Sequence, residues 1–374
     1  MKVPARLKEG IARYRPDDAE DLAEFQLANF GPGTRQVDRE RDAWLFDRNP
    51  SRSEGDGRDM WVCRRDGVIV GQQAEIPFDL QVGASAHRAA WGIDLMVDDA
   101  WRMRGVGPAL VATQLDHRPI VCGLNMSDKG FALYERGGFI DLGVIPVYLR
   151  PLDLRRAVGL GQVPGGVRRV APVLGPVLRA ADSAGLAALR ARGVRLEPIE
   201  RFDERVDEVW TAVTAPGHAV LARRDRSVLS WSIDQRPDRD RMWRYYLTRR
   251  GRVLGYVVVR TGGTHDAPTA VVVDYLATPR WVAPLLVAAG DAARGRGAVA
   301  MSVKTRDEPA DRYLRAAGFV RRNRGADEPI RFMVHCRDAD LADQLGDPAR
   351  WFITSADCDL EYAMTTESDI LAVS

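Results

Sequence analysis

The run Val97-Asp-Asp-Ala-Trp101-Arg-Met-Arg-Gly105-Val-Gly107 is the most specific pattern in the chain. It follows residues 93–97, which are apolar enough for a buried strand, and precedes residues 108–115, which are typical of a helix with proline in its first turn. Glycines in such a turn let backbone N–H groups approach a ligand closely, and the helix N-terminus adds positive potential. The run therefore predicts a pyrophosphate site.

The sequence of the turn excludes two common kinds of phosphate-binding site. The run lacks the Lys-Ser/Thr ending of a P-loop and the third glycine of a dinucleotide-binding Gly-x-Gly-x-x-Gly turn. Its Arg-x-x-Gly-x-Gly pattern resembles motif A of the GNAT-type N-acetyltransferases, in which this turn holds the pyrophosphate of acetyl-CoA. Residues 120–126 are the expected next strand. Residues 130–139, which include Tyr134 and end in Gly138-Phe139, resemble the helix and Tyr-x-x-x-Gly-Phe ending of motif B.

The strands before the turn fit the same family. Residues 61–72 predict a hairpin around Asp66-Gly67. The resemblance covers residues 10–150. It implies an α/β (α+β) fold, with a mixed, mostly antiparallel sheet flanked by helices.

Length and composition indicate the number of domains, the cellular location and the kinds of partner to expect. The chain has 374 residues, which predicts two domains, and it is 45% hydrophobic and 28% charged. It has no apolar run of membrane length, and its first residues lack the apolar core of a signal peptide, so we expect a cytoplasmic protein. A net charge of +2 gives no reason to expect a nucleic-acid partner.

No metal is expected. None of the four cysteines forms a Cys-x-x-Cys pair, and Cys63 and Cys122 lie in strand patterns typical of small core residues. The acidic run at residues 357–361, Asp-Cys-Asp-Leu-Glu, could suggest a cation site. We interpret it instead as the solvated face of a terminal strand.

The second half of the sequence repeats the first faintly. Residues 93–101 align with residues 273–281, and Gly138-Phe139 aligns with Gly318-Phe319, both at an offset of 180 residues. The 61–71 hairpin has a counterpart at 243–255. These matches predict two tandem copies of one fold.

The predicted copies differ at the glycine turn. Leu285 and Val287 occupy the positions of Gly105 and Gly107, and their side chains would block a backbone approach to phosphate. We therefore expect an N-terminal GNAT domain at residues 1–151 that binds acetyl-CoA, and a degenerate GNAT-like domain at residues 196–374.

Residues 152–195 are expected to link these domains. Eight arginines in this segment face only Asp153 and Asp182: Arg155, Arg156, Arg168, Arg169, Arg179, Arg190, Arg192 and Arg195. A basic amphipathic segment can lie on an anionic membrane or bind a polyanion. The simpler interpretation is a solvated helix over residues 177–190, with Leu178, Leu186 and Leu189 packed on a domain.

The resemblance implies direct attack of an amine on an acetyl thioester. A backbone N–H near Met96 and Val97 would polarise the carbonyl, and Tyr134 would protonate the departing thiolate. Asp94 and Glu75 are the candidate bases, beside a water chain or no base at all. Asp274 repeats Asp94 in the second copy, which favours a structural role for Asp94. The expected coenzyme contacts are Met96, Val97, Arg102, Met103, Arg104, Gly105, Val106, Gly107 and Ser127, the last standing where many family members have asparagine.

The predicted function is thus transfer of an acetyl or other acyl group from CoA to a small-molecule or peptide amine, bound near the seam between the copies. Two alternatives stay open. Tandem copies of this fold also occur in aminoacyl transferases that use charged tRNA, but those lack the CoA turn. The second alternative is a non-catalytic protein that binds acyl-CoA as a partner of a biosynthetic complex. The sequence does not determine the acceptor or the oligomeric state.

Overall fold

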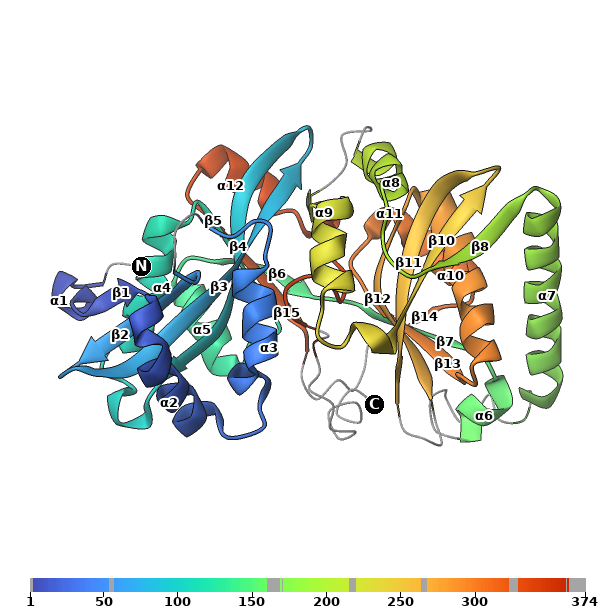
Figure 1. Cartoon of the computed structure of the whole chain (residues 1–374). Helices are drawn as coiled ribbons and strands as arrows, with labels where there is room; N and C mark the ends of the chain where they lie inside the picture. The colour runs from blue at the N-terminus through green and yellow to red at the C-terminus, as the bar shows by residue number, and fades with distance from the viewer. Residues whose placement is uncertain are drawn as a thin grey trace.

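The computed structural model describes residues 3–53, 57–159, 169, 171–214, 220–263, 268–322, 329–360 and 362. Over these residues the strands form two mixed sheets, each flanked by helices (Figure 1). The α/β class expected from the sequence is confirmed. Cys63 and Cys122 are buried, as predicted.

The first sheet holds most of the strands expected from the first half. Its order is β1 (Ile11–Arg13), β2 (Met60–Arg65), β3 (Val68–Val82), β4 (Ser85–Val97), β5 (Ile120–Leu124), β15 (Arg331–Cys336) and β6 (Ile140–Val144). Two short strands extend it beside β3, namely β9 (Val220–Ala222) and β16 (Trp351–Phe352). The β2–β3 hairpin turns at Asp66 and Gly67, which both have positive φ, as the predicted two-residue turn requires.

The second sheet repeats this scheme. Its order is β8 (Val194–Ile199), β10 (Met242–Arg249), β11 (Arg252–Gly262), β12 (Thr269–Ala277), β13 (Ala300–Lys304), β7 (Val147–Pro151) and β14 (Val320–Arg322). The β10–β11 hairpin turns at Arg250 and Gly251, whose φ values match those of Asp66 and Gly67. In both sheets the fourth strand carries a bulge beside the repeated aspartate, Asp94 or Asp274.

The two sheets exchange one strand. β7 comes from the first half of the chain but lies between β13 and β14 in the second sheet (Figure 1). β15 comes from the second half and lies between β5 and β6 in the first sheet. The expected boundary at residue 151 therefore does not separate the sheets. The sequence did not indicate this exchange, because backbone pairing leaves no mark in the sequence of one strand.

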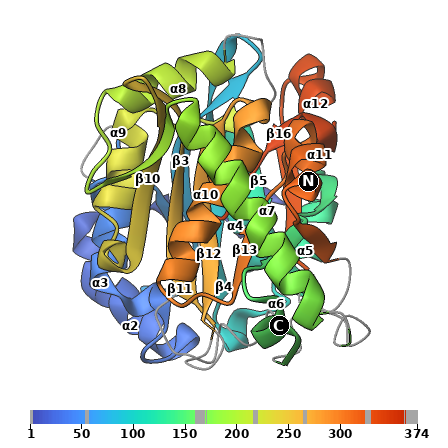
Figure 2. The same cartoon turned by 90° about the vertical axis from the view of Figure 1, so that its right-hand side faces the viewer.

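Helices cover both sheets. The helices of the first sheet's half are α1 (Ala5–Lys8), α2 (Ala19–Phe30), α3 (Arg39–Asp42), α4 (Val106–His117), α5 (Asp128–Arg136) and α12 (Ala339–Leu345), with α1 lying against α4. Those of the second half are α6 (Leu154–Gly159), α7 (Ala171–Ala191), α8 (Arg205–Thr214), α9 (Arg226–Leu229), α10 (Pro279–Gly295) and α11 (Glu308–Ala316), with α6 lying against α7. Helix α7 is longer than the predicted 177–190 and lies outermost on the second half (Figure 2).

The halves meet through an approximately symmetric contact. α3 and α9 each continue into a π-helical turn, at Ala43–Asp47 and Ser230–Asp234. Trp44 Nε1 donates to the Trp231 carbonyl at 2.9 Å, and Trp231 Nε1 donates to the Trp44 carbonyl at 2.7 Å. The two rings stack with centroids 5.8 Å apart. Both buried indole N–H groups are thereby satisfied, which fixes one half against the other.

Candidate active site

The glycine turn has the geometry that its sequence predicts. After β4, Asp98 caps a short 3₁₀ turn (Asp99–Trp101) by accepting from Ala100 N at 2.9 Å. Gly105 then forms the N-cap of α4 with a φ of 86°. The first backbone N–H groups of α4 have no partner within the helix, so they are free to face an anion.

Side chains around the turn supply positive charge. Arg102 Nε donates to the Val97 carbonyl at 3.1 Å, and its guanidinium pairs with Asp99. Arg104 stacks over the Trp101 ring at 5.1 Å. Helix α1 lies over the turn, because a Cβ on Gly105 would be 2.7 Å from Leu7 Cδ1. Residue 105 must therefore be glycine for two reasons, its positive φ and its close neighbour.

Beside this turn, strands β4 and β5 separate. They pair only at Ala90–Val121 and Trp91–Cys122, and the next positions, Gly92 and Gly123, no longer pair. The Tyr134 ring, from α5, covers both glycines. A Cβ on Gly92 would be 2.4 Å from Tyr134 Oη, and a Cβ on Gly123 would be 2.6 Å from Tyr134 Cε2. Only glycines at both positions leave room for this tyrosine.

The second sheet has different residues at the positions that correspond to Gly92, Gly123 and Tyr134. At the 180-residue offset, Gly92, Gly123 and Tyr134 become Val272, Val303 and Leu314. Val272 and Val303 are still paired, so β12 and β13 separate one position later than β4 and β5. Helix α10 begins at Pro279, so Leu285 and Val287 lie inside a helix where the first half has its glycine turn. The first half therefore has both the glycine turn and a hollow between β4 and β5 at Gly92 and Gly123, which the Tyr134 ring occupies. Both features are replaced in the second half.

Tyr134 is buried, and its ring stacks on Phe139 with centroids 4.2 Å apart. Burial raises the pKa of its hydroxyl. The hydroxyl therefore stays protonated at neutral pH. No described residue forms a hydrogen bond with it, so its proton is available to a ligand beside Gly92 and Gly123.

Gln114 of α4 is the other polar group at this hollow. Its side chain is fully buried, and neither amide atom has a hydrogen-bond partner among the described residues. A Cβ on Gly92 would be 3.2 Å from Gln114 Nε2, so the amide and the Tyr134 hydroxyl meet at the same point. Sequence reasoning missed this residue, because a glutamine inside a helix carries no signal of its own.

Glu75, on β3, lies behind Gln114. Its Oε2 accepts from Arg118 Nε at 2.6 Å, and Arg118 also pairs with Asp59 at 2.6 Å. Burial raises the pKa of Glu75, and the positive charge of Arg118 opposes that effect. The Gln114 amide also lowers the pKa of Glu75, so it lies beside this carboxylate. Glu75 is therefore a buried ion-pair member next to Gln114.

Asp94, on β4, points to the other face of the sheet. It accepts from Arg41 Nη2 at 2.8 Å and from Gln36 Nε2 at 3.1 Å. Arg41 is 1% exposed and also pairs with Asp359 at 2.5 Å. Burial by itself would raise the pKa of Asp359, but the charges of Arg41 and Arg35 outweigh it and hold that pKa well below its usual range. Asp94 thus belongs to a buried network of charges.

The second half has a matching network. Asp274 accepts from Thr354 Oγ1 at 2.7 Å and from Tyr256 Oη at 2.7 Å, and Arg224 joins it to Asp357. Asp357 and Asp359 are 4% and 3% exposed. The prediction of a solvated acidic face is therefore wrong: the two aspartates turn inward, one toward each half, because each finds a buried arginine. Glu361 lies outside the described residues.

The remaining predicted contacts are near the turn. Met96 and Val97 end β4, and Met103 is fully exposed with a φ of 62°. Ser127 is the N-cap of α5 and accepts from Gly130 N at 3.2 Å. Among the described residues, no group of three or more His, Cys, Asp or Glu side chains could hold a metal ion.

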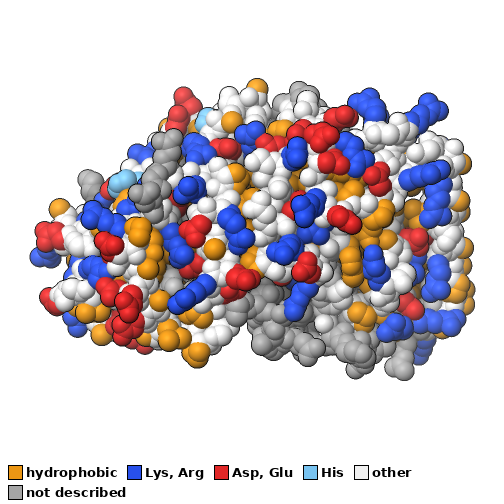
Figure 3. Space-filling view, in the orientation of Figure 1, with side chains coloured by type: hydrophobic (Ala, Val, Ile, Leu, Met, Phe, Trp, Pro, Cys, Tyr) orange, Lys and Arg blue, Asp and Glu red, His pale blue; other side chains and the backbone are white. Residues whose placement is uncertain are grey.

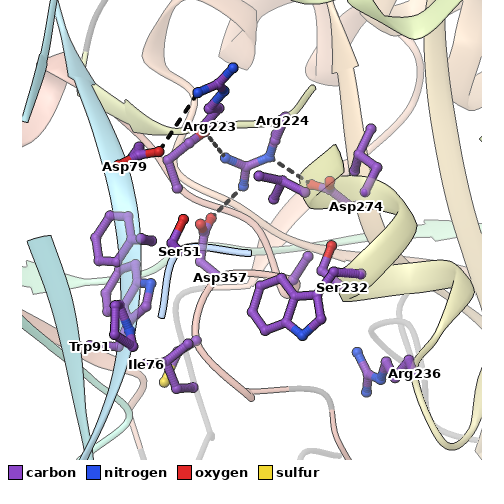
Figure 4. Close-up of a pocket in the computed structure, with 18 of the residues that line it drawn as sticks. Ser51, Ile76, Asp79, Trp91, Arg223, Arg224, Ser232, Arg236, Asp274 and Asp357 are labelled. Atoms are coloured by element: carbon purple, nitrogen blue, oxygen red, sulfur yellow. Dashed lines mark hydrogen bonds and ion pairs between the residues drawn. The ribbon is translucent and has the colours of Figure 1, made fainter. Parts of the chain in front are cut away.

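A pocket lies between the halves and is lined by residues of both (Figure 4). Its space, counted with the part open to solvent, is about 640 Å³. Trp91 lines it, and Trp91 precedes Gly92 on β4, so the two residues face opposite sides of the sheet. The ion pairs Arg223–Asp79 and Arg224–Asp357 also line it, together with three further aromatic side chains: Trp44, Phe78 and Trp231.

Several solved structures share this fold. They include GCN5-related N-acetyltransferases from Anabaena variabilis (TM-score 0.60, 14% identity, covering 88% of this chain and 72% of that one) and Kribbella flavida (0.54, 15%, 89% and 72%). Another is Saccharomyces cerevisiae N-myristoyltransferase with bound myristoyl-CoA (0.51, 10%, 89% and 83%). No protein-family model matches the sequence, and neither does any curated protein. The similarity therefore shows a shared fold, that of GCN5-related N-acetyltransferases.

Proposed function

We propose that this protein is an acyltransferase that moves an acetyl or longer acyl group from CoA to an amine. The observation that carries the proposal is the hollow where β4 and β5 separate, with Tyr134 seated on Gly92 and Gly123 beside the glycine turn. A pyrophosphate at the turn would leave the thioester end of the coenzyme free to reach this hollow. The shared fold with N-acetyltransferases and N-myristoyltransferase supports the same chemistry.

In the proposed reaction the amine attacks the thioester carbonyl carbon, and the C–S bond then breaks. Backbone N–H groups near Met96 and Val97, freed by the separation of the strands, would stabilise the oxyanion. Tyr134 gives its proton to the thiolate, and the proton that the nitrogen loses as the amide forms restores the tyrosine hydroxyl. We place the acceptor in the pocket between the halves, which is lined by Trp91, the residue before Gly92 on β4.

We assign the role of base to neither candidate. Asp94 accepts from Arg41 and Gln36, and Glu75 accepts from Arg118. Each would have to weaken an ion pair in order to hold a proton. An amine of low pKa reaches its neutral, nucleophilic form without a base.

The repeated strand order supports two tandem copies, of which only the first binds CoA. In the second copy, helix α10 occupies the place of the turn and valines occupy the hollow. We propose that this copy shapes the acceptor pocket. The intact turn of the first copy argues against a tRNA-dependent transferase.

Calorimetry with CoA tests the proposal. Gly105→Val should abolish binding, because its Cβ would displace Leu7 and distort the turn. Gly67→Val is the matched control, since Gly67 has a similar φ of 83° and no neighbour within 4 Å of a built Cβ. Equal CoA affinity in Gly105→Val and the parent would refute the site.

A thiol-release screen of acetyl-CoA and longer acyl-CoAs against a library of amines then tests turnover. The proposal predicts thiol release with some amine. Tight CoA binding with no release from any amine would show a non-catalytic acyl-CoA-binding protein instead.

A further inference from the structure

Helix α7 is unusually exposed for its apolar composition. It has 21 residues, of which only Ala171 and Leu186 are buried. In the part of the chain that the structure describes, nine large hydrophobic side chains are exposed, and four of them lie in its first two turns: Val173 (72%), Leu174 (38%), Val177 (57%) and Leu178 (48%). Such a cluster marks a surface that meets a partner.

Helix α7 has one face packed on the second half and one apolar face exposed to solvent. Its inner face packs on the second half through Leu186 and through Asp182, which pairs with Arg150 and Arg294. Its outer face carries Val173, Val177, Ala180 and Ala184 at helical spacing, all exposed. Leu178, which the sequence placed on the packed face, is also exposed.

Every exposed charge on this helix and its described flanks is positive. Arg169, Arg179, Arg190 and Arg192 are exposed, whereas Asp182 is the sole acidic residue between 169 and 192 and is already neutralised. Blue and orange side chains follow one another along the right-hand edge of Figure 3, where α7 lies in Figure 1. Arg168 lies outside the described residues.

We infer that α7 docks the protein on an anionic lipid surface, with the valines and leucines in the acyl boundary and the arginines at the headgroups. Charge selects this partner over a second copy, since a symmetric α7–α7 contact would bring arginines together with no free carboxylate between them. The apolar face selects it over a nucleic acid, which would leave Val173 and Val177 in water.

The position of α7 would allow the protein to attach along a membrane surface. None of the described helices is long and apolar enough to cross a membrane. α7 lies at the far end of the second half, away from α4 and the glycine turn (Figure 1). Docking would thus leave the proposed CoA site open, and the inference does not depend on the proposed function.

Sedimentation of the full chain with vesicles tests this. We expect binding to vesicles of phosphatidylcholine mixed with phosphatidylglycerol and little binding to phosphatidylcholine alone. Arg179→Ala with Arg190→Ala should weaken binding about thirtyfold, at roughly 1 kcal/mol per arginine. Val173→Ser with Val177→Ser should weaken it through the apolar face. Thermal melting should be unchanged in both, since all four side chains are exposed.

Two controls match these variants. Arg48→Ala with Arg226→Ala removes two exposed arginines elsewhere, and Val68→Ser removes a valine that is 65% exposed in the first half. Both should bind vesicles as the parent does. The inference is wrong if the parent does not bind anionic vesicles, or if the α7 variants bind equally well. It is also wrong if the valine pair instead abolishes a concentration-dependent dimer, or if the parent binds RNA or DNA but not lipid.

Discussion

Tyr134 is the residue on which the proposed chemistry depends most. Its ring is held by Phe139 and two glycines, so removing the hydroxyl changes no packing contact of the ring. Tyr134→Phe should therefore lower kcat by roughly 10²-fold, in the range of acid–base contributions, and leave the Kd for CoA unchanged. Burial raises the pKa of the hydroxyl, so the difference should persist from neutral pH upward until the tyrosine ionises. A variant as fast as the parent at every pH would make Tyr134 a packing residue only.

Gly92 offers a second test of the same hollow. Gly92→Ala puts a methyl group 2.4 Å from Tyr134 Oη, so it should lower both turnover and stability, the latter by about 1–3 kcal/mol. Combining it with Tyr134→Phe removes the clashing oxygen. The double variant should regain much of the stability, measured by urea unfolding, but not the turnover. Full activity of Gly92→Ala would mean that the hydroxyl does not need its observed position.

At the scale of elements, the C-terminal segment 354–360 connects the two halves. It gives Asp359 to the network of Arg41 and Asp94, and Asp357 to the network of Arg224 and Asp274. Removing one member of a buried ion pair costs about 3–5 kcal/mol, because the other charge is left buried.

The repeated networks distinguish a base from a structural carboxylate. Asp94→Asn and Asp274→Asn should both lower the free energy of unfolding by a few kcal/mol. If Asp94 is structural, as its likeness to Asp274 indicates, the folded fraction of each variant should keep its activity within a few-fold. Activity per folded molecule would be measured below the melting temperature. A selective loss of orders of magnitude in Asp94→Asn would make Asp94 the base.

Helix α11 carries a pH-dependent element. Asp307, at its N-cap, accepts from Tyr275 Oη at 3.0 Å, and burial raises its pKa to about 6. Because this pKa lies above the unfolded value of about 3.9, the folded state holds the proton more tightly. This residue's contribution to stability should fall as pH rises from about 4 to about 6, by on the order of 2 kcal/mol. Asp307→Asn should remove that part of the slope in urea unfolding between these pH values, and an unaltered slope would contradict the assignment.

For the whole molecule, the exchanged strands make the halves interdependent. Residues 1–151 alone would lack β15, which separates β5 from β6, and would carry β7 without its partners. We expect this fragment to be insoluble or unfolded, since the edges of two strands would lose their hydrogen bonds. Circular dichroism and solubility of the fragment check this, and a soluble fragment that unfolds cooperatively would contradict it.

The intact molecule provides the matching control. A protease site inserted between residues 160 and 168 would cut the chain between α6 and α7. The two pieces should remain together in size-exclusion chromatography after cleavage, because β7 and β15 hold each in the other's sheet. Separation without denaturant would show that the exchange adds little to their association.

The sequence by itself determined the local features. The glycine turn, the hairpins at Asp66-Gly67 and Arg250-Gly251, and Tyr134 on its helix all depend on contacts within a few residues. Positive φ at glycine and apolar spacing can be read from a single chain for this reason. The absence of the turn from the second half was also visible, as leucine and valine at the glycine positions.

Only the tertiary structure decided which distant parts of the chain come together. The exchange of β7 and β15 depends on backbone hydrogen bonds, which any sequence can make. Asp357 and Asp359 resembled surface residues, and their burial depends on Arg224 and Arg41, which lie far away in sequence. Gln114 can be recognised as a residue of the candidate active site only because the structure places it beside Gly92 and Tyr134. In each case the partner comes from a distant part of the chain, so local pattern carries no record of it, whereas packing in three dimensions does.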